Sequence, residues 1–118
     1  MAAKDALGRR GEDLATAFLV DTGYTILDRN WRCPQGEIDV VALDGTETVF
    51  VEVKTRSSVA FGHPLEAITT LKLARLRRLA AAWCGVHPGN HNRIRIDAIA
   101  VIVPRTGAPQ LEHLKRVF

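Results

Sequence analysis

Two short segments that alternate apolar and ionisable residues constrain the fold of this chain more than any other feature. They are Gly36-Glu37-Ile38-Asp39 and Val51-Glu52-Val53-Lys54. Such alternation is typical of β-strands, whose side chains change faces at every residue. Glu37 and Asp39 therefore share one face of their strand, as Glu52 and Lys54 do of theirs. Carboxylates on neighbouring strands repel one another unless a cation lies between them, and the simplest such cation is a metal ion.

The length of the connection between the segments decides whether these charges meet. Directly opposed residues of an antiparallel pair point to the same side of the sheet. A four-residue connection over residues 44–47 pairs Leu43 with Thr48, and the same register pairs Asp39 with Glu52 and Glu37 with Lys54. Opposed β-carbons are then about 5 Å apart, close enough for Asp39 and Glu52 to bind one divalent ion. A two-residue turn at 44–45 instead places Glu52 opposite Glu37, and a three-residue turn separates the faces.

The remaining sequence predicts an α/β fold in which helices flank a mixed sheet. Apolar residues recur at helical spacing over 4–22, before Gly23. Strands are predicted at 24–32, 37–43, 48–55, 93–103 and 110–115, and a second helix over 64–84 opens at Pro64. The predicted order is α-β-β-β-α-β-β. The long helix after the third strand favours a parallel crossover to the fourth, whose apolar second half indicates a central position.

Composition limits the class of protein. A length of 118 residues with 47% hydrophobic residues predicts one compact domain over 1–118. A net charge of +3 and a pI near 9.2 favour an anionic partner, nucleic acid before a membrane surface. Cys33 and Cys84 fit neither a disulfide framework nor a zinc site, which indicates a reducing compartment. With no apolar run near the roughly 20 residues of a membrane span and no signal layout, we expect a soluble cytoplasmic protein.

The paired carboxylates predict a specific chemistry. Hard oxygen ligands suit Mg²⁺ or Mn²⁺, which also take phosphate oxygens as ligands. Such an ion polarises a phosphate and lowers the pKa of a bound water, so the pattern predicts phosphodiester hydrolysis. Lys54 can orient that water or help to deprotonate it, and can stabilise the charge of the transition state. In this interpretation Asp39, Glu52 and Lys54 are the catalytic residues.

Two helical residues are candidates to complete the site. Glu12 lies at the margin of the first helix's apolar stripe. Its carboxylate either reaches over the sheet to the metal or stays in solvent near Arg9 and Thr16. Lys72 falls in the middle of the apolar stripe of the second helix. Its ammonium either extends to solvent along its aliphatic stem or contacts the carboxylates or a bound phosphate.

Several further residues receive predicted roles. Arg56 and Arg75 are predicted phosphate contacts, with the Thr55 hydroxyl as a third. Glu37 is predicted to pair with Lys54 or to support the ligands rather than to bind the metal itself. Trp31 and Phe61 either stack on bases, flank a dimer contact or pack in the interior. Asp97, in a core strand, is interpreted as a structural residue that is hydrogen-bonded within the sheet.

These motifs resemble those of the PD-(D/E)XK nuclease superfamily, and most closely its small bacterial YraN-like proteins, which are similar to archaeal Holliday-junction resolvases. The resemblance runs from Gly8-Arg9-Arg10-Gly11-Glu12 through Gly-Glu-Ile-Asp and Val-Glu-Val-Lys-Thr-Arg to Phe118. One departure is Ile38, where the superfamily's motif has proline. The resemblance implies a restriction-endonuclease-like core, metal binding by Glu12, Asp39 and Glu52, and catalytic support by Lys54.

Three interpretations of function remain open from the sequence. The first is a divalent-metal-dependent endonuclease that cuts structured nucleic acid, branched DNA rather than RNA, as a homodimer that cuts both strands. The second is a nucleic-acid-binding module of the same fold that cleaves nothing, or cleaves only with a partner. The third treats the carboxylates as exposed charges that prevent pairing at the edge of a sheet.

Overall fold

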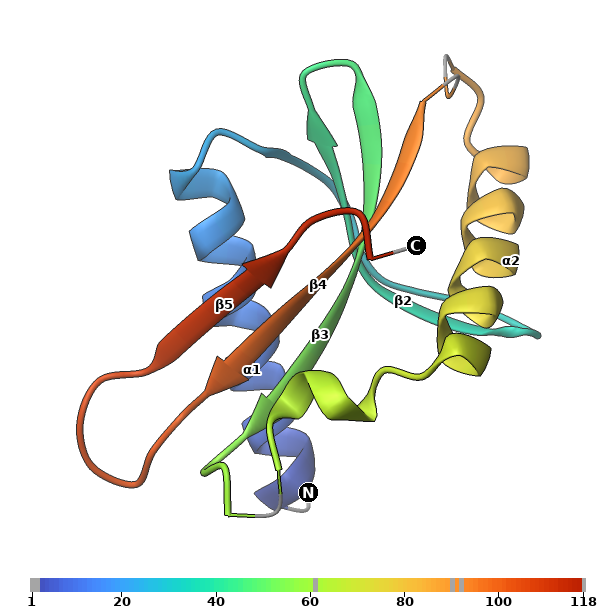
Figure 1. Ribbon diagram of the computed structural model, residues 1–118. Helices are drawn as coiled ribbons and strands as arrows, with labels where there is room; N and C mark the ends of the chain where they lie inside the picture. The colour runs from blue at the N-terminus through green and yellow to red at the C-terminus, as the bar shows by residue number, and fades with distance from the viewer. Residues whose placement is uncertain (1–2, 61, 90, 92, 118) are drawn as a thin grey trace.

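A five-stranded sheet carries a long helix on each face (Figure 1). The computed structural model describes residues 3–60, 62–89, 91 and 93–117. The elements in chain order are α1 (Ala3–Asp21), β1 (Thr25–Cys33), β2 (Gly36–Asp44), β3 (Glu47–Arg56), the 3₁₀ helix η1 (Pro64–Ala67), α2 (Thr70–Val86), β4 (Ile94–Ile102) and β5 (Gln110–Leu114). The predicted α/β class and the predicted order of helices and strands are confirmed.

The order of strands in the sheet is β1-β2-β3-β4-β5. The pairs β1–β2, β2–β3 and β4–β5 are antiparallel, whereas β3–β4 is parallel, as a crossover through α2 requires. The predicted parallel crossover and the central position of the fourth strand are therefore confirmed. By strand order β2 and β3 both lie inside the sheet. Asp39 is buried, so it is not an exposed edge charge, and for this residue that interpretation is wrong.

The register between β2 and β3 agrees with the four-residue connection. Leu43 pairs with Thr48. Asp44 and Glu47 pair as well, so the turn itself consists of the two residues between them. Gly45 adopts φ 60°, a left-handed conformation that glycine enters without steric cost. The alternative turn at 44–45, which shifts Glu52 opposite Glu37, is wrong.

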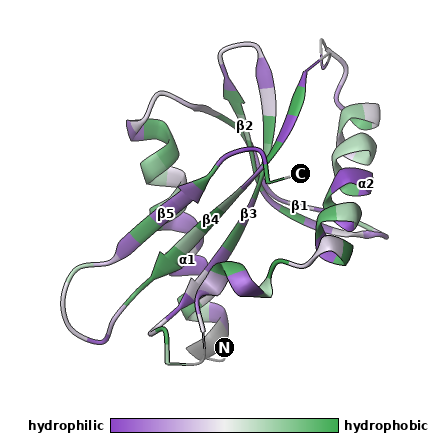
Figure 2. Cartoon of the chain, in the orientation of Figure 1, coloured by the Kyte–Doolittle hydropathy of each residue, from purple (hydrophilic) through white to green (hydrophobic). Residues whose placement is uncertain are grey.

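Each helix covers its own apolar cluster. Ala15 and Leu19 of α1 pack on one face of the sheet, against β2, β3 and β4. Leu76, Leu79 and Trp83 of α2 pack on the other face, around Phe50. Figure 2 shows long hydrophobic stretches in β3 and β4 and a largely hydrophilic edge strand β5. Within the described part of the chain, no helix is long and apolar enough to cross a membrane.

The predicted single helix over 64–84 is wrong, because the segment forms η1 and then α2. Ile68 is extended, with φ −92° and ψ 104°, and ends η1. Thr69 starts the next helix, since its hydroxyl accepts a hydrogen bond from the Lys72 backbone N–H at 3.2 Å. The break places Lys72 in the first turn of α2 rather than in the middle of a longer helix.

Candidate metal centre

The two central strands separate at Asp39. Their pairing ends at Val40–Val51, while β3 continues beside β4 as far as Arg56–Ile102. Just beyond the last pair, Oδ2 of Asp39 accepts a hydrogen bond from the Val53 backbone N–H at 2.8 Å. This bond satisfies an amide that the ladder leaves without a strand partner on that side. The separation therefore fixes the Asp39 carboxylate at the opening between β2 and β3.

β2 also bends at this point, where its hairpin with β1 turns beneath α2 (Figure 1). Ile38 and Val41 both belong to the apolar cluster under α2, although residues three apart in a regular strand point to opposite faces. In β1, Asn30 lies between the pairs Arg29–Val40 and Trp31–Ile38 and adopts φ 52°. Asparagine tolerates this left-handed conformation better than most residues. Asn30 thus gives a local cause for the bend that presents Asp39.

Glu12 reaches the same point because α1 lies very close to β3. A β-carbon at Gly11 would overlap the side chain of Thr55, so only glycine allows this approach. The carboxyl of Glu12 is half-buried, and Asn30 and Asp39 are among the groups that act on its pKa. The side chain of Glu12 therefore reaches over the sheet toward Asp39, as the first of its two interpretations predicts.

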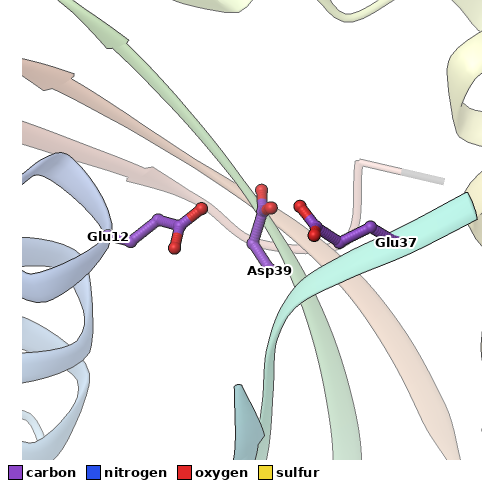
Figure 3. A group of neighbouring side chains, drawn as sticks. All are labelled: Glu12, Glu37 and Asp39. Atoms are coloured by element: carbon purple, nitrogen blue, oxygen red, sulfur yellow. The ribbon is translucent and has the colours of Figure 1, made fainter. Parts of the chain in front are cut away.

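Carboxylate oxygens of Glu12, Glu37 and Asp39 lie within 4.8 Å of one another, and the three side chains point toward a common centre (Figure 3). Burial, and then the nearby charge of Glu52, raise the pKa of Asp39 to about 8. Burial and the charge of Glu37 raise the pKa of Glu12. We call Glu12, Glu37 and Asp39 the carboxylate cluster. The raised pKa values show that the cluster resists full ionisation, and a bound cation would favour the ionised form.

The predicted pairing of Glu37 with Lys54 is wrong. Oε2 of Glu37 instead lies 2.6 Å from Nε of Arg32, its neighbour across β1–β2. Nζ of Lys54 lies 3.2 Å from Oε1 of Glu52. The cause is the separation of β2 from β3, because strands that part beyond Val40–Val51 no longer hold residues 37 and 54 opposite each other. Glu37 is therefore free to turn toward Glu12 and Asp39.

A hollow of about 350 Å³ opens over these residues, and we call it the acidic hollow. Asp39, Glu52 and Lys54 line it from the sheet, and the half-buried Lys72 and the exposed Arg75 line it from α2. Lys72 thus lines the same hollow as the carboxylates, as its second interpretation requires, while its contact with a phosphate stays a prediction. The hollow thus combines an acidic floor with cations on one wall, which suits a phosphate beside a metal ion.

The other predicted contacts lie around this centre. Thr55 and Arg56 line a second hollow of about 700 Å³, which Glu12 and Lys54 also line. The exposed Arg56 guanidinium donates a hydrogen bond to the Thr55 carbonyl at 3.0 Å. Trp31 is half-buried against the apolar cluster under α2. Phe61 and Phe118 lie outside the described residues.

Sequence reasoning missed two residues at the centre and one beside it. Asn30 carried a usable signal, because asparagine is depleted in strands and tolerates positive φ. Arg32 carried a weaker signal, since its pairing with Glu37 depends on the β1–β2 register. Arg105 follows β4 and lines the second hollow, yet no spacing pattern connects it to Glu12. Only the folded arrangement of β3 beside β4 brings Arg105 to this site.

Together the fold and the cluster define an α/β protein in which β2 and β3 part beside one buried and two half-buried carboxylates, with a lysine two residues after Glu52. The chain belongs to the uncharacterised protein family UPF0102, whose family model matches residues 11–101. A UPF0102 protein of Beutenbergia cavernae is 57% identical over 117 residues, covering 99% of each chain. Another from Arthrobacter sp. (strain FB24) is 56% identical over 117 residues, with the same coverage. One from Frankia casuarinae is 50% identical over 118 residues and covers 100% of each chain.

Proposed function

We propose that this chain is a divalent-metal-dependent endonuclease of the PD-(D/E)XK type, of the YraN-like branch, that hydrolyses phosphodiester bonds in branched DNA. The observation that carries the proposal is the carboxylate cluster, whose oxygens lie within 4.8 Å of one another at the opening between β2 and β3. An all-oxygen ligand set matches the preferences of Mg²⁺ and Mn²⁺.

The residues present fit such an ion. We assign metal binding to Glu12, Asp39 and Glu52. Glu12 and Asp39 belong to the carboxylate cluster, and Glu52 lines the same hollow as Asp39. Glu37, the third member of the cluster, would donate an oxygen to the ion or to its water shell. The Val53 backbone N–H donates a hydrogen bond to Oδ2 of Asp39, and this bond orients the carboxylate toward the cluster. The pKa of about 8 at Asp39 arises from burial and from like charges, and a divalent cation would remove that repulsion.

The bound ion would polarise the scissile phosphate and make a coordinated water more acidic. Lys54 lies 3.2 Å from Glu52, where its ammonium can orient the attacking water and donate to the phosphate oxygen that gains charge. Lys72 and Arg75 approach the same hollow from α2 and supply phosphate contacts on its wall. In this proposal the acidic side chains would bind the ion, and the cationic side chains would bind the substrate.

A cleavage panel tests the proposal. Branched, flapped, duplex and single-stranded DNAs, and matching RNAs, are incubated with the protein in Mg²⁺ and in Mn²⁺. Asp39→Asn, Glu52→Gln and Lys54→Ala should each lower the cleavage rate about 100-fold or more. Asp13→Asn is the matched control, because Asp13 neighbours Glu12 on α1 but points to solvent and pairs with Arg29. Cleavage that survives all three active-site substitutions contradicts the proposal.

Metal binding is measured separately by calorimetric titration with Mn²⁺. The proposal requires binding by the wild type and a loss of binding in Asp39→Asn. Nucleic acid that is bound but not cut, with no metal bound, would identify a binding module of the same fold instead. Light scattering tests the proposed homodimer, which symmetric cutting of two strands requires.

A further inference from the structure

The second hollow, beside the acidic hollow, has the features of a nucleotide site. Its volume of about 700 Å³ falls within the range of small-molecule sites, roughly 300–1,000 Å³. Glu12 and Lys54 line it, so it adjoins the carboxylate cluster and the catalytic lysine. We call it the flanking hollow. It is formed by α1, by the end of β3 and by the segment that follows β4.

The surface of the flanking hollow is of two kinds. Leu7, Val53 and Val103 give it an apolar part. Arg56 and Arg105 give it a cationic part. The two arginines come from the same end of the sheet, because β3 and β4 are parallel and the Val103 backbone N–H donates to the Arg56 carbonyl at 2.8 Å.

This combination matches one chemical class of ligand. The apolar part suits the face of a base or sugar, and the guanidinium groups suit the phosphate attached to it. A base that is stacked and paired in a duplex cannot enter a concave site unless it leaves the stack, which costs a few kcal/mol. An unpaired nucleotide enters without that cost.

We infer that the flanking hollow binds an unpaired nucleotide next to the scissile phosphate, with its phosphate on Arg56 and Arg105. In the proposed branched DNA, each cut strand then has an unpaired nucleotide beside its cut site. That the neighbouring phosphate is the one cleaved rests on the proposed function. Binding of the unpaired nucleotide does not depend on it, because this binding needs no metal.

Fluorescence anisotropy in EDTA tests this binding without cleavage. The probes are a labelled single-stranded DNA, a blunt duplex of the same sequence and the matching single-stranded RNA. Wild type should bind the single strands at least tenfold more tightly than the duplex. Arg105→Gln should weaken single-strand binding about tenfold, the loss expected for a charged hydrogen bond, and should reduce the salt dependence. Arg93→Gln is the matched control, because the exposed Arg93 precedes β4 at its opposite end.

A second pair of variants fills the hollow instead of removing a charge. Gly8 lines it, and a β-carbon there meets nothing within 4 Å. Gly8→Leu should therefore fold normally and weaken single-strand binding at least tenfold. Gly85→Leu is its control, since Gly85 lies in α2 and its β-carbon position is equally open. Circular dichroism and melting temperature verify that each variant is folded.

The outcomes separate this inference from the proposed function. Equal binding of single strand and duplex, or single-strand binding that both Arg105→Gln and Gly8→Leu leave unchanged, overturns the inference even if the protein is a nuclease. Absence of Mn²⁺ binding and of all cleavage overturns the proposed function, whereas the EDTA measurement still decides whether the hollow binds an unpaired nucleotide. Comparison of the DNA and RNA probes identifies which sugar it prefers.

Discussion

Two groups of buried charge in the same sheet have opposite electrostatic character. Asp39, 9% exposed, lies in the carboxylate cluster, and its pKa is raised to about 8 by burial and by neighbouring acids. Asp97 is fully buried at 0% exposure, yet its pKa is lowered. Burial alone would raise both pKa values. The difference comes from the charges that surround each carboxylate.

Asp97 has a complete set of donors. Its carboxylate accepts hydrogen bonds from the Arg95 guanidinium at 2.8 and 3.0 Å, from His113 at 2.7 Å and from the Arg116 backbone N–H at 3.1 Å. These donors outweigh the effect of burial on the pKa of Asp97. Arg95 in turn contacts Asp44 at 2.9 Å and Glu47 at 3.2 Å. Here the fold places cations directly on the carboxylate, whereas Asp39 accepts from the neutral Val53 backbone N–H and has acidic neighbours.

The largest expected effect comes from disrupting the group around Asp97, in which Arg95 and His113 balance the carboxylate; we call it the balanced group. Asp97→Asn leaves the buried Arg95 without its main anion, which should lower the free energy of unfolding by about 3–5 kcal/mol. Denaturant unfolding at pH 7 measures the loss. Asp13→Asn removes an exposed pair with Arg29 and should cost less than about 1 kcal/mol. Similar losses in the two variants would contradict the structural role of the Arg95–Asp97 pair.

The second prediction concerns the opposite sign of the pH dependence at Asp39. Because the folded pKa of about 8 exceeds the ordinary value of 3.8, the unfolded chain binds fewer protons between these pH values. This contribution to stability is present below pH 4 and is lost as the pH rises through 8. Asp97, whose pKa is lowered, contributes stability above its ordinary pKa that is lost as the pH falls.

Asp39→Asn tests this sign because asparagine cannot ionise but still accepts from the Val53 N–H. In EDTA at pH 8 the variant should be more stable than wild type by an amount on the order of 2 kcal/mol, and the difference should vanish near pH 4. At 100 times its dissociation constant, Mn²⁺ should stabilise wild type by about 2.7 kcal/mol and leave the variant unchanged. A wild type that is more stable than the variant at pH 8 in EDTA would show that repulsion is absent from the cluster.

The different surroundings of Asp39 and Asp97 could be predicted from the sequence only in part, for a physical reason. The β2–β3 register follows from local turn length, so Leu43–Thr48 pairing could be predicted. The separation beyond Val40–Val51 follows the bend of β2 under α2, which depends on tertiary packing. Counting along strands therefore located Asp39, Glu52 and Lys54 but assigned the wrong partner to Glu37.

The balanced group also shows which contacts the sequence alone can and cannot predict. Asp97 was predicted to be structural and hydrogen-bonded, and this is confirmed. Among its donors, Arg95 lies two residues away on the same face of β4 and could have been named. His113 in β5 and Arg116 after β5 reach Asp97 only because β5 pairs with β4. Break points of helices are more accessible: Thr69, in a run of β-branched residues, is a recognisable N-cap that could have divided the predicted 64–84 helix.

The third prediction tests how the cluster is assembled from α1. Gly11→Ala places a methyl group against Thr55, and the resulting displacement of α1 should cost about 1–3 kcal/mol and weaken Mn²⁺ binding by moving Glu12. Gly8→Ala is the matched control, because its β-carbon is unobstructed and alanine favours helix by up to about 1 kcal/mol. Thr55→Ala in the Gly11→Ala background should recover part of both losses. Unchanged stability and Mn²⁺ affinity in Gly11→Ala would show that α1 need not approach β3 so closely.

The smallest expected effect separates two roles of Glu37. Arg32 is 79% exposed at its side chain and pairs with Glu37 at the rim of the cluster, so Arg32→Gln should change stability by less than about 1 kcal/mol. If Glu37 is an oxygen donor to the ion, loss of its competing cation should tighten Mn²⁺ binding about two- to fivefold, as calorimetric titration measures. If Glu37 only supports the other ligands, release from Arg32 should leave the affinity unchanged or weaken it. Arg93→Gln removes the same charge at a distance and corrects for the change in net charge, so the sign of the remaining difference decides whether Glu37 belongs with Asp39 as a ligand.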